Sequence, residues 1–259
     1  MGRIGIIGGS GLYNVEGIEW ETVEEIDTPF GKPSDAVKLG NVDGKPVAFL
    51  PRHGNRHQYP PHMVNYRANL WALKHIGVDR VLAFSAVGSL KEEYARGHVC
   101  VVRQYLDFTK SRIRTFYDNE AVHVSMAEPY CPKLSQLAVE VAHDLEIPVH
   151  DDVTYVCIEG PSFSTKAESS MYRRLGGGVI GMTGCPETQL ARELGLCYAS
   201  ITTVTDYDCW KDEPVSAEEV AQTMKANENN IKRIMIEMIK RLPEEWSCSC
   251  KDALRNARL

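Results

Sequence analysis

The chain has 259 residues, 43% hydrophobic and 25% charged, enough to bury one sizeable core as one large α/β domain or two small ones. Its formal charge of −6 and pI near 5.8 disfavour a nucleic-acid partner, which usually needs a basic face. No stretch approaches the roughly 18 apolar residues of a membrane span, and the N-terminus has no signal-peptide layout, so a cytoplasmic protein is expected.

Strands and helices are predicted to alternate along the chain. In order, they are strands at 3–7 and 46–50, a helix at 62–76, a strand at 78–85, a helix at 132–146, a strand at 154–158, a helix at 165–175, a strand at 179–182, a helix at 187–194, a strand at 196–203 and a helix at 216–242. This alternation predicts a mostly parallel sheet covered by helices on both sides, with ligands at the carboxyl ends of the strands. The sequence contains no repeat and no Pro/Gly/Ser-rich linker, so we expect one domain over 1–242, followed by a polar tail over 243–259.

A glycine-rich loop, Gly8-Gly9-Ser10-Gly11, follows the first strand. Its glycines allow close backbone approach, and successive N–H groups with a hydroxyl can cradle a phosphate. The loop lacks the third glycine of a dinucleotide-binding fingerprint, since Asn14 stands there, and it lacks the Gly-Lys-Ser/Thr of an NTP-binding loop. A plain glycine turn is the alternative.

A basic loop follows the second strand. Arg52 can grip a phosphate with a two-pronged hydrogen bond, and His53 can donate or accept beside it. Four more basic or imidazole groups come within the next 15 residues, namely Arg56, His57, His62 and Arg67. A solvated basic loop is the alternative.

Two loops of small residues have the same character. Ser85 to Ser89 and Met182 to Gly184 each offer a hydroxyl and backbone N–H groups after a predicted strand. Each alone is typical of an ordinary tight turn. Together with Arg52 and His53 they would surround a tetrahedral anion without any lysine.

The loop from Glu159 to Thr165 joins a strand to a helix. Phe163 can stack on a heterocycle, and Glu159 can reach a sugar hydroxyl. The alternatives are a core phenylalanine and a helix N-cap supplied by Ser164 or Thr165.

Two carboxylates, Asp206 and Asp208, come just after the apolar run 196–203. If the strand persists that far, its period of two places both on one face, pointing at the same ligand. Such a pair suits a site that donates a proton to a polar ring or reads its amino groups. Burial of like charges is expected to raise at least one pKa of the pair, and any phosphate must bind elsewhere.

The last helix is predicted to begin at Ser216, with Glu219 completing a capping box, and to end before Pro243. Its apolar stripe, which starts at Val220, is typical of core or subunit packing, and its first turn can also face an active site.

Eight cysteines are present, and six of them stand among apolar neighbours, as small buried hydrophobes do. Cys248 and Cys250 lie instead in the polar tail. A local or intersubunit disulfide, free thiols and metal ligation all remain open for this pair. Zinc would need two more ligands, and none is adjacent in the sequence, so no metal site is expected.

Five motifs occur in order along the chain. They are Gly-Gly-Ser-Gly-Leu, Pro-Arg-His-Gly, Glu-Gly-Pro-Ser-Phe-Ser-Thr-Lys-Ala-Glu-Ser, Met-Thr-Gly-Cys-Pro-Glu and Thr-Asp-Tyr-Asp-Cys-Trp-Lys. In this combination the chain resembles the 5′-methylthioadenosine phosphorylases, of the trimeric branch of purine nucleoside phosphorylases, from about residue 3 to about 242. The resemblance implies a single α/β domain whose central mixed β-sheet is distorted towards a barrel and flanked by helices. It also implies a homotrimer or a dimer of trimers.

The resemblance carries roles to particular residues. The phosphate-binding positions match Ser10, Arg52, His53, Ser85, Ala86 and Thr183. The substrate-binding positions match Phe163 for base stacking, Met182 for the ribose hydroxyls, Asp206 for purine N7, Asp208 for the 6-amino group and Val220 in the last helix. Asp206 is the expected catalytic residue, and His123 matches a residue lent to the 5′ pocket of the neighbouring subunit.

The implied reaction is phosphorolysis of 5′-methylthioadenosine to adenine and 5-methylthioribose 1-phosphate, with inorganic phosphate as co-substrate and no cofactor. Ala217 and Ala221 stand where animal relatives carry larger apolar residues around the methylthio group, which leaves a broad or 6-oxopurine nucleoside phosphorylase as the alternative. A non-catalytic nucleoside sensor would not need a separate phosphate site. A nucleoside hydrolase would need an aspartate cluster for calcium, and none stands near the start of the chain.

Overall fold

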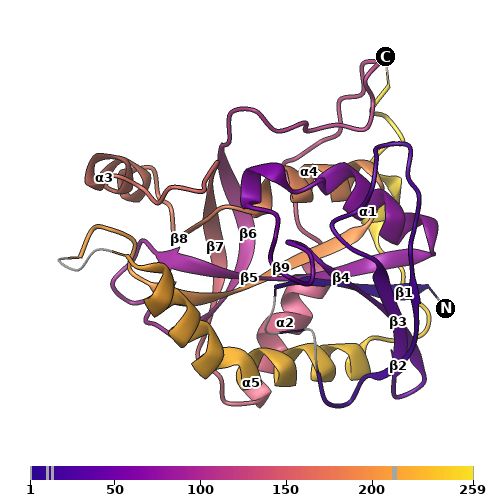
Figure 1. Cartoon of the computed structure of the whole chain (residues 1–259), viewed down its shortest axis with the longest axis horizontal. Helices are drawn as coiled ribbons and strands as arrows, with labels where there is room; N and C mark the ends of the chain where they lie inside the picture. Colours follow the sequence, from indigo (N-terminus) through magenta and orange to yellow (C-terminus); the bar gives the residue numbers. More distant parts are fainter. Residues whose placement is uncertain (1, 10–11, 13–14, 212–214, 259) are drawn as a thin grey trace.

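The computed structural model describes residues 2–9, 12, 15–211 and 215–258, and within them nine strands form one sheet in the order β2-β3-β4-β1-β5-β8-β7-β6-β9 (Figure 1). The strands are β1 (Arg3–Gly8), β2 (Glu19–Glu24), β3 (Val37–Val42), β4 (Lys45–Pro51), β5 (Val78–Ser89), β6 (Val99–Phe108), β7 (Val149–Ile158), β8 (Val179–Gly181) and β9 (Cys197–Asp206). The sheet is mixed, because it contains both parallel and antiparallel pairings.

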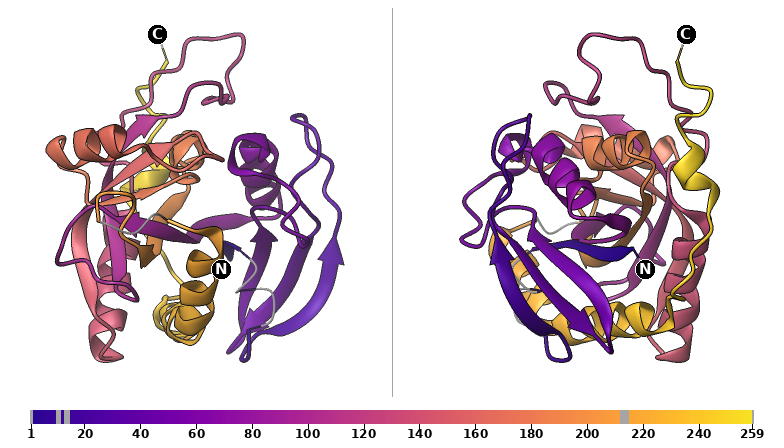
Figure 2. Two further views of the ribbon diagram at one scale, coloured as in Figure 1. Left: turned by 60° about the vertical axis from the view of Figure 1, so that its left-hand side comes forward. Right: turned by 90° about the vertical axis from the view of Figure 1, so that its right-hand side faces the viewer.

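The sheet closes on itself through one additional pairing, between β5 and β9. Strands β5, β8, β7, β6 and β9 thereby form a barrel, and β1, β4, β3 and β2 extend from β5 as an open wing (Figure 2). Closure removes the free edges that β5 and β9 would otherwise present. The expected single α/β fold with a central mixed sheet distorted towards a barrel is confirmed.

Helices cover both faces of the sheet (Figure 1). They are α1 (Tyr66–His75), α2 (Pro132–Asp144), α3 (Lys166–Arg174), α4 (Gly184–Glu193) and α5 (Ala217–Arg241), with short 3₁₀ helices at Pro61–Met63 and Ser249–Asp252. Helices α1 and α4 pack together on one face, and α2 and α5 pack together on the other. Each face has its own hydrophobic cluster.

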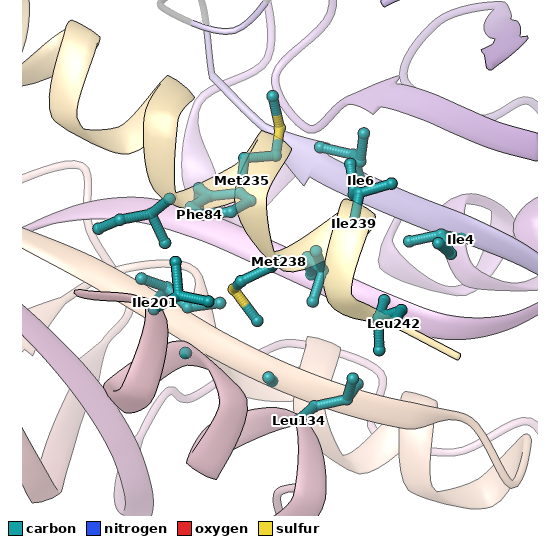
Figure 3. Packing of buried hydrophobic residues seen from close by; sticks show 14 of the residues in the cluster. Ile4, Ile6, Phe84, Leu134, Ile201, Met235, Met238, Ile239 and Leu242 are labelled. Atoms are coloured by element: carbon teal, nitrogen blue, oxygen red, sulfur yellow. The ribbon is translucent and has the colours of Figure 1, made fainter. Parts of the chain in front are cut away.

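In helix α5, the predicted N-cap and apolar stripe can be compared with the observed packing. The Ser216 hydroxyl accepts a hydrogen bond from the Glu219 N–H at 3.1 Å, which fixes where the helix starts. Further along, Met235 and Met238 are fully buried against β-strand residues such as Ile201 (Figure 3). The second half of the predicted stripe is therefore core, and the first turn remains partly exposed.

Three strands were missed by the sequence analysis: β2, β3 and β6. Strand β2 has the burial pattern of an exposed edge, so it carries little hydrophobic signal. Strand β5 is also longer than predicted, because it runs on to Ser89. Ser85 and Ala86 therefore lie within a strand, where we had expected a loop after one.

The C-terminal tail is tied to the body of the protein. Cys248 and Cys250 are buried in the same cluster as α2 and α5. The last described residues reach the loop between β6 and α2, where the His123 N–H donates to the Ala257 carbonyl at 2.7 Å (Figure 2). Among the described residues, no helix is both long enough and apolar enough to cross a membrane.

Candidate active site

One cavity of 310 Å³ collects most of the predicted site residues. Its lining includes Arg52, His53, Ser85, Ala86, Phe163, Met182, Thr183, Asp206, Asp208 and Val220. They come from the ends of β4, β8 and β9, from β5, from the loop before α3 and from the first turn of α5. Ser10, the remaining predicted phosphate residue, lies outside the described residues.

Arg52 is held rigidly at one end of this cavity. Its Nε and Nη2 donate to the two carboxylate oxygens of Glu187 at 2.7 and 2.8 Å, and its Nη1 donates to the Phe84 carbonyl at 2.8 Å. Both side chains are almost fully buried, and the Tyr198 hydroxyl donates to Glu187 at 2.7 Å. Burial alone would lower the pKa of the Arg52 guanidinium, but the Glu187 carboxylate outweighs it, and the pKa is raised. A guanidinium has five N–H donors, so two remain for an anion.

His53 is neutral at physiological pH. Burial and the adjacent Arg52 charge lower the pKa of His53 to about 4. Its Nδ1 lies 2.8 Å from the Tyr59 carbonyl, which can only accept, so Nδ1 carries the proton. The Nε2 atom is then an acceptor, suited to a phosphate that still carries a proton.

The two aspartates are brought together by a turn, and not by the strand periodicity that was predicted. Strand β9 ends at Asp206, and Asp208 lies in a turn with a φ of 49°, so the two are not related by strand periodicity. The turn instead brings the Asp208 N–H to Asp206 Oδ1 at 2.8 Å. Gly88 makes room for it, since a Cβ there would lie 2.7 Å from Asp206 Oδ1. Both acids are buried and line the cavity.

The pKa of Asp206 lies above its ordinary value. Burial is the main reason that its pKa is raised, and the charge of Asp208 adds to the effect, as predicted. Thr205 Oγ1 lies 2.8 Å from Asp206 Oδ2 and 3.2 Å from the Val87 carbonyl oxygen. The hydrogen bond that the Thr205 hydroxyl donates to Asp206 Oδ2 partly offsets this rise in the pKa.

The loop before α3 presents an aromatic ring and a hydroxyl. Phe163 is 46% exposed and lines the cavity, so it is not a core residue. Thr165 is the N-cap of α3, and it forms a complete capping box with Glu168. Ser164 also lines the cavity, and its buried Oγ has no hydrogen-bond partner within the described part of the chain. The sequence analysis had weighed Ser164 only as a helix cap.

Arg112 is a positioning residue that the sequence analysis missed. Its Nη1 donates to the carbonyls of Met182 and Cys185 at 2.7 and 2.5 Å, and its Nη2 donates to the Glu159 carbonyl at 2.6 Å. The Glu159 carboxylate accepts from Arg112 Nε at 3.2 Å and from the Ser111 N–H at 3.2 Å. Glu159 therefore holds the arginine, where we had expected a contact to a sugar. Arg112 lies in a loop without periodicity, so no sequence signal marked it.

A second cavity of 260 Å³ adjoins the first. The two share wall residues on β5 and α5, including Phe84, Ser85 and Met224, and Ala221 lines only the second. The small side chain of Ala221 leaves this space open beside the site. His123, by contrast, is exposed on the loop between β6 and α2 and lines neither cavity of its own chain.

Comparison with known proteins gives the family. Residues 3–240 match the model of the phosphorylase superfamily. The chain belongs to the phosphorylase superfamily.

The relatives within it match over nearly the full length. The S-methyl-5′-thioadenosine phosphorylase of Pyrococcus horikoshii is 53% identical over 256 residues, covering 98% of both chains. That of Nitrosopumilus maritimus is also 53% identical, over 98% of this chain and 97% of its own.

Two solved structures show the same fold. A methylthioadenosine phosphorylase from an antarctic soil metagenomic library has a TM-score of 0.95 at 41% identity, covering 100% of this chain and 92% of its own. The methylthioadenosine phosphorylase of Schistosoma mansoni in complex with adenine has a TM-score of 0.95 at 36% identity, covering 100% of this chain and 99% of its own.

The buried pair at the anion end yields a stability prediction. Glu187→Gln leaves the Arg52 charge buried without a countercharge, and we expect it to cost about 3–5 kcal/mol of unfolding free energy. Asp151→Asn weakens the more exposed pair with Arg103 and should cost below about 1 kcal/mol. Urea unfolding of both variants at one protein concentration measures the difference. Equal losses would contradict the role of Glu187.

Proposed function

We propose that the protein cleaves 5′-methylthioadenosine with inorganic phosphate, giving adenine and 5-methylthioribose 1-phosphate. The observation that carries this proposal is the arrangement of two chemically opposite groups along β5. Arg52 is bonded to the carbonyl of Phe84, and the turn with Asp206 and Asp208 sits on Gly88. Four residues of strand separate these points by about 13 Å, which leaves room for a ribose between an anion and a purine.

The phosphate is proposed to bind at the Arg52 end. The two remaining guanidinium donors, the hydroxyl of Thr183 and the backbone at Ser85 and Ala86 would hold it, with His53 Nε2 accepting from its protonated oxygen. Ser10 is proposed as a further donor. Holding the nucleophile below C1′ makes the attack nearly intramolecular, which can supply up to about 7–11 kcal/mol. The phosphate charge also stabilises the ribosyl cation that develops.

The purine is proposed to bind at the acid end. Protonated Asp206 would serve N7 as the base departs, and Asp208 would accept from the 6-amino group. Phe163 would stack on the ring, and the free Ser164 hydroxyl would add a polar contact to the base. Backbone atoms of Met182 would meet the ribose hydroxyls.

The 5′ end of the nucleoside is proposed to lie towards α5. Val220 lines the main cavity, and Ala221 lines the space that adjoins it. His123 would complete the 5′ pocket of a neighbouring subunit in a trimer or a dimer of trimers. Exposed apolar side chains such as Met63 and Met171 fit such an assembly. The eight cysteines, none of which is in a disulfide, fit a reducing compartment such as the cytoplasm.

A 6-oxopurine nucleoside phosphorylase is the second candidate, because the small side chains of Ala217 and Ala221 make the site less selective for a 5′-methylthio group. Asp208 favours the 6-aminopurine, since a carboxylate repels a 6-keto oxygen. Leaving a buried polar group unpaired gives strong discrimination against the wrong base.

The proposed function is tested by base release from 5′-methylthioadenosine and from inosine, each with and without phosphate. We expect phosphate-dependent adenine release, with inosine a poor substrate. Faster release of hypoxanthine than of adenine would show that the preferred substrate is a 6-oxopurine nucleoside. Release without phosphate would overturn the assignment of the anion end.

Asp208→Asn should lower the preference for 6-aminopurine nucleosides. The amide can donate to a keto oxygen, so the ratio of kcat/KM for adenosine over inosine is expected to fall about 10-fold to 100-fold, the range of a charged hydrogen bond. Asp152→Asn, which changes an exposed carboxylate, serves as the control. An unchanged ratio in Asp208→Asn would remove this role from Asp208.

The decrease of kcat at alkaline pH, the alkaline limb of the pH profile, should be caused by ionisation of Asp206. Because its pKa is raised, the active protonated form is present below that pKa, and turnover is lost as the pH rises through it. Asp206→Asn should lower kcat by about 100-fold or more and abolish this limb, whereas Asp208→Asn should retain it. Steady-state kcat against pH for the three proteins is the measurement. A limb that persists in Asp206→Asn would assign it to another group, such as phosphate itself.

A further inference from the structure

Four cysteines converge at the side of the barrel away from the candidate active site. They are Cys131 at the N-cap of α2, Cys197 at the start of β9, and Cys248 and Cys250 in the tail. All four are buried, and their sulfurs lie within 4.8 Å of one another. The Sγ atom of Cys248 is 3.5 Å from that of Cys131 and 3.4 Å from that of Cys250.

This arrangement has the dimensions of a tetrahedral metal centre. A zinc–sulfur bond of 2.3 Å makes the edges of a four-thiolate tetrahedron about 3.8 Å long. The sulfurs converge as one group of four, so small side-chain adjustments suffice for all to reach one ion. The fold thus supplies the two further ligands that the Cys-Ser-Cys sequence lacks.

We propose that Cys131, Cys197, Cys248 and Cys250 bind a structural zinc ion in a closed four-thiolate site. Binding exchanges the thiol protons for Zn²⁺, and it needs no oxidant. Disulfides between the same sulfurs would require one, because each bond removes two electrons. Since all four positions around the ion are filled by protein, the site has no open position for chemistry.

The surroundings suit a centre of net charge about −2, which four thiolates and one Zn²⁺ produce. The Trp246 indole N–H donates to Cys197 Sγ at 3.1 Å, the kind of hydrogen bond that orients a metal-bound thiolate. Cys131 lies at the positive end of the α2 dipole. Lys133, in the first turn of α2, donates to the Ser247 carbonyl at 2.6 Å and brings its positive charge beside the tail.

The ion would fasten the tail at the point where it crosses the barrel. The tail passes so close to Gly195 that a Cβ there would lie 3.2 Å from the Lys251 carbonyl oxygen. Beyond the site, Arg258 pairs with Val122 in an isolated bridge next to His123. Zinc therefore secures the segment that supports the His123 loop, and this metal site stands whether or not the proposed reaction is correct.

The test begins with metal analysis of the full-length chain, purified without a metal-affinity tag. We expect one zinc ion per subunit in the unaltered protein and in Cys100→Ala, whose buried thiol lies outside the cluster. Cys248→Ser/Cys250→Ser should lose it. Zinc retained by this double variant would show adventitious binding and overturn the proposal.

Two measurements on the unaltered chain keep the proposal falsifiable if that variant fails to fold. Cobalt added after chelation should give the intense visible absorption of a tetrahedral four-thiolate centre, and zinc should abolish it. Thiol titration in denaturant with a chelator, and without a reductant, should find all eight cysteines free. Fewer free thiols would show disulfides, and eight free thiols without metal uptake would show thiol packing alone. Either result would refute the site.

Discussion

Strand β5 cannot slide without breaking its pairings in both the open wing and the barrel, and the geometry of the candidate active site depends on that constraint. It pairs with β1 in the open wing and with β8 and β9 in the barrel. The carbonyl of Phe84 fixes Arg52, and Gly88 receives the aspartate turn. The distance between the anion end and the acid end is therefore set by the register of one strand, whatever the loops around it do.

The anion end and the acid end of the cavity bury groups of opposite charge, and each group is stabilised in a different way. At the anion end a buried guanidinium needs a countercharge, and Glu187 provides it while leaving two N–H groups uncommitted. At the acid end burial raises the pKa of Asp206, which is the direction that proton donation to a departing base requires. Neutral His53 adds no charge at the anion end, and it can accept from a protonated phosphate. These preferences come from packing around each group and precede any ligand.

Much of the fold and of the site could be predicted from the sequence, because the informative residues stand beside strong local patterns. Arg52, Thr183 and Asp206 each come at the end of an apolar strand, and the structure places all three in one cavity. Edge strand β2 was missed because its side chains are mostly exposed.

The remaining features depend on contacts between segments that are far apart in the chain. Glu187 lies 135 residues from the arginine that it neutralises, and Arg112 acts through the carbonyls of three residues in two other segments. Asp208 reaches Asp206 through a left-handed turn, which strand periodicity does not describe. The cysteine cluster likewise joins α2, β9 and the tail, so adjacency in the sequence could not reveal it.

The most direct test of the account is a crystal structure of the full chain with adenine and phosphate bound together. The account predicts phosphate against Arg52, His53 and Thr183, with purine N7 facing Asp206 and the 6-amino group facing Asp208. A purine turned so that N7 points away from Asp206, or phosphate bound away from Arg52, would contradict it.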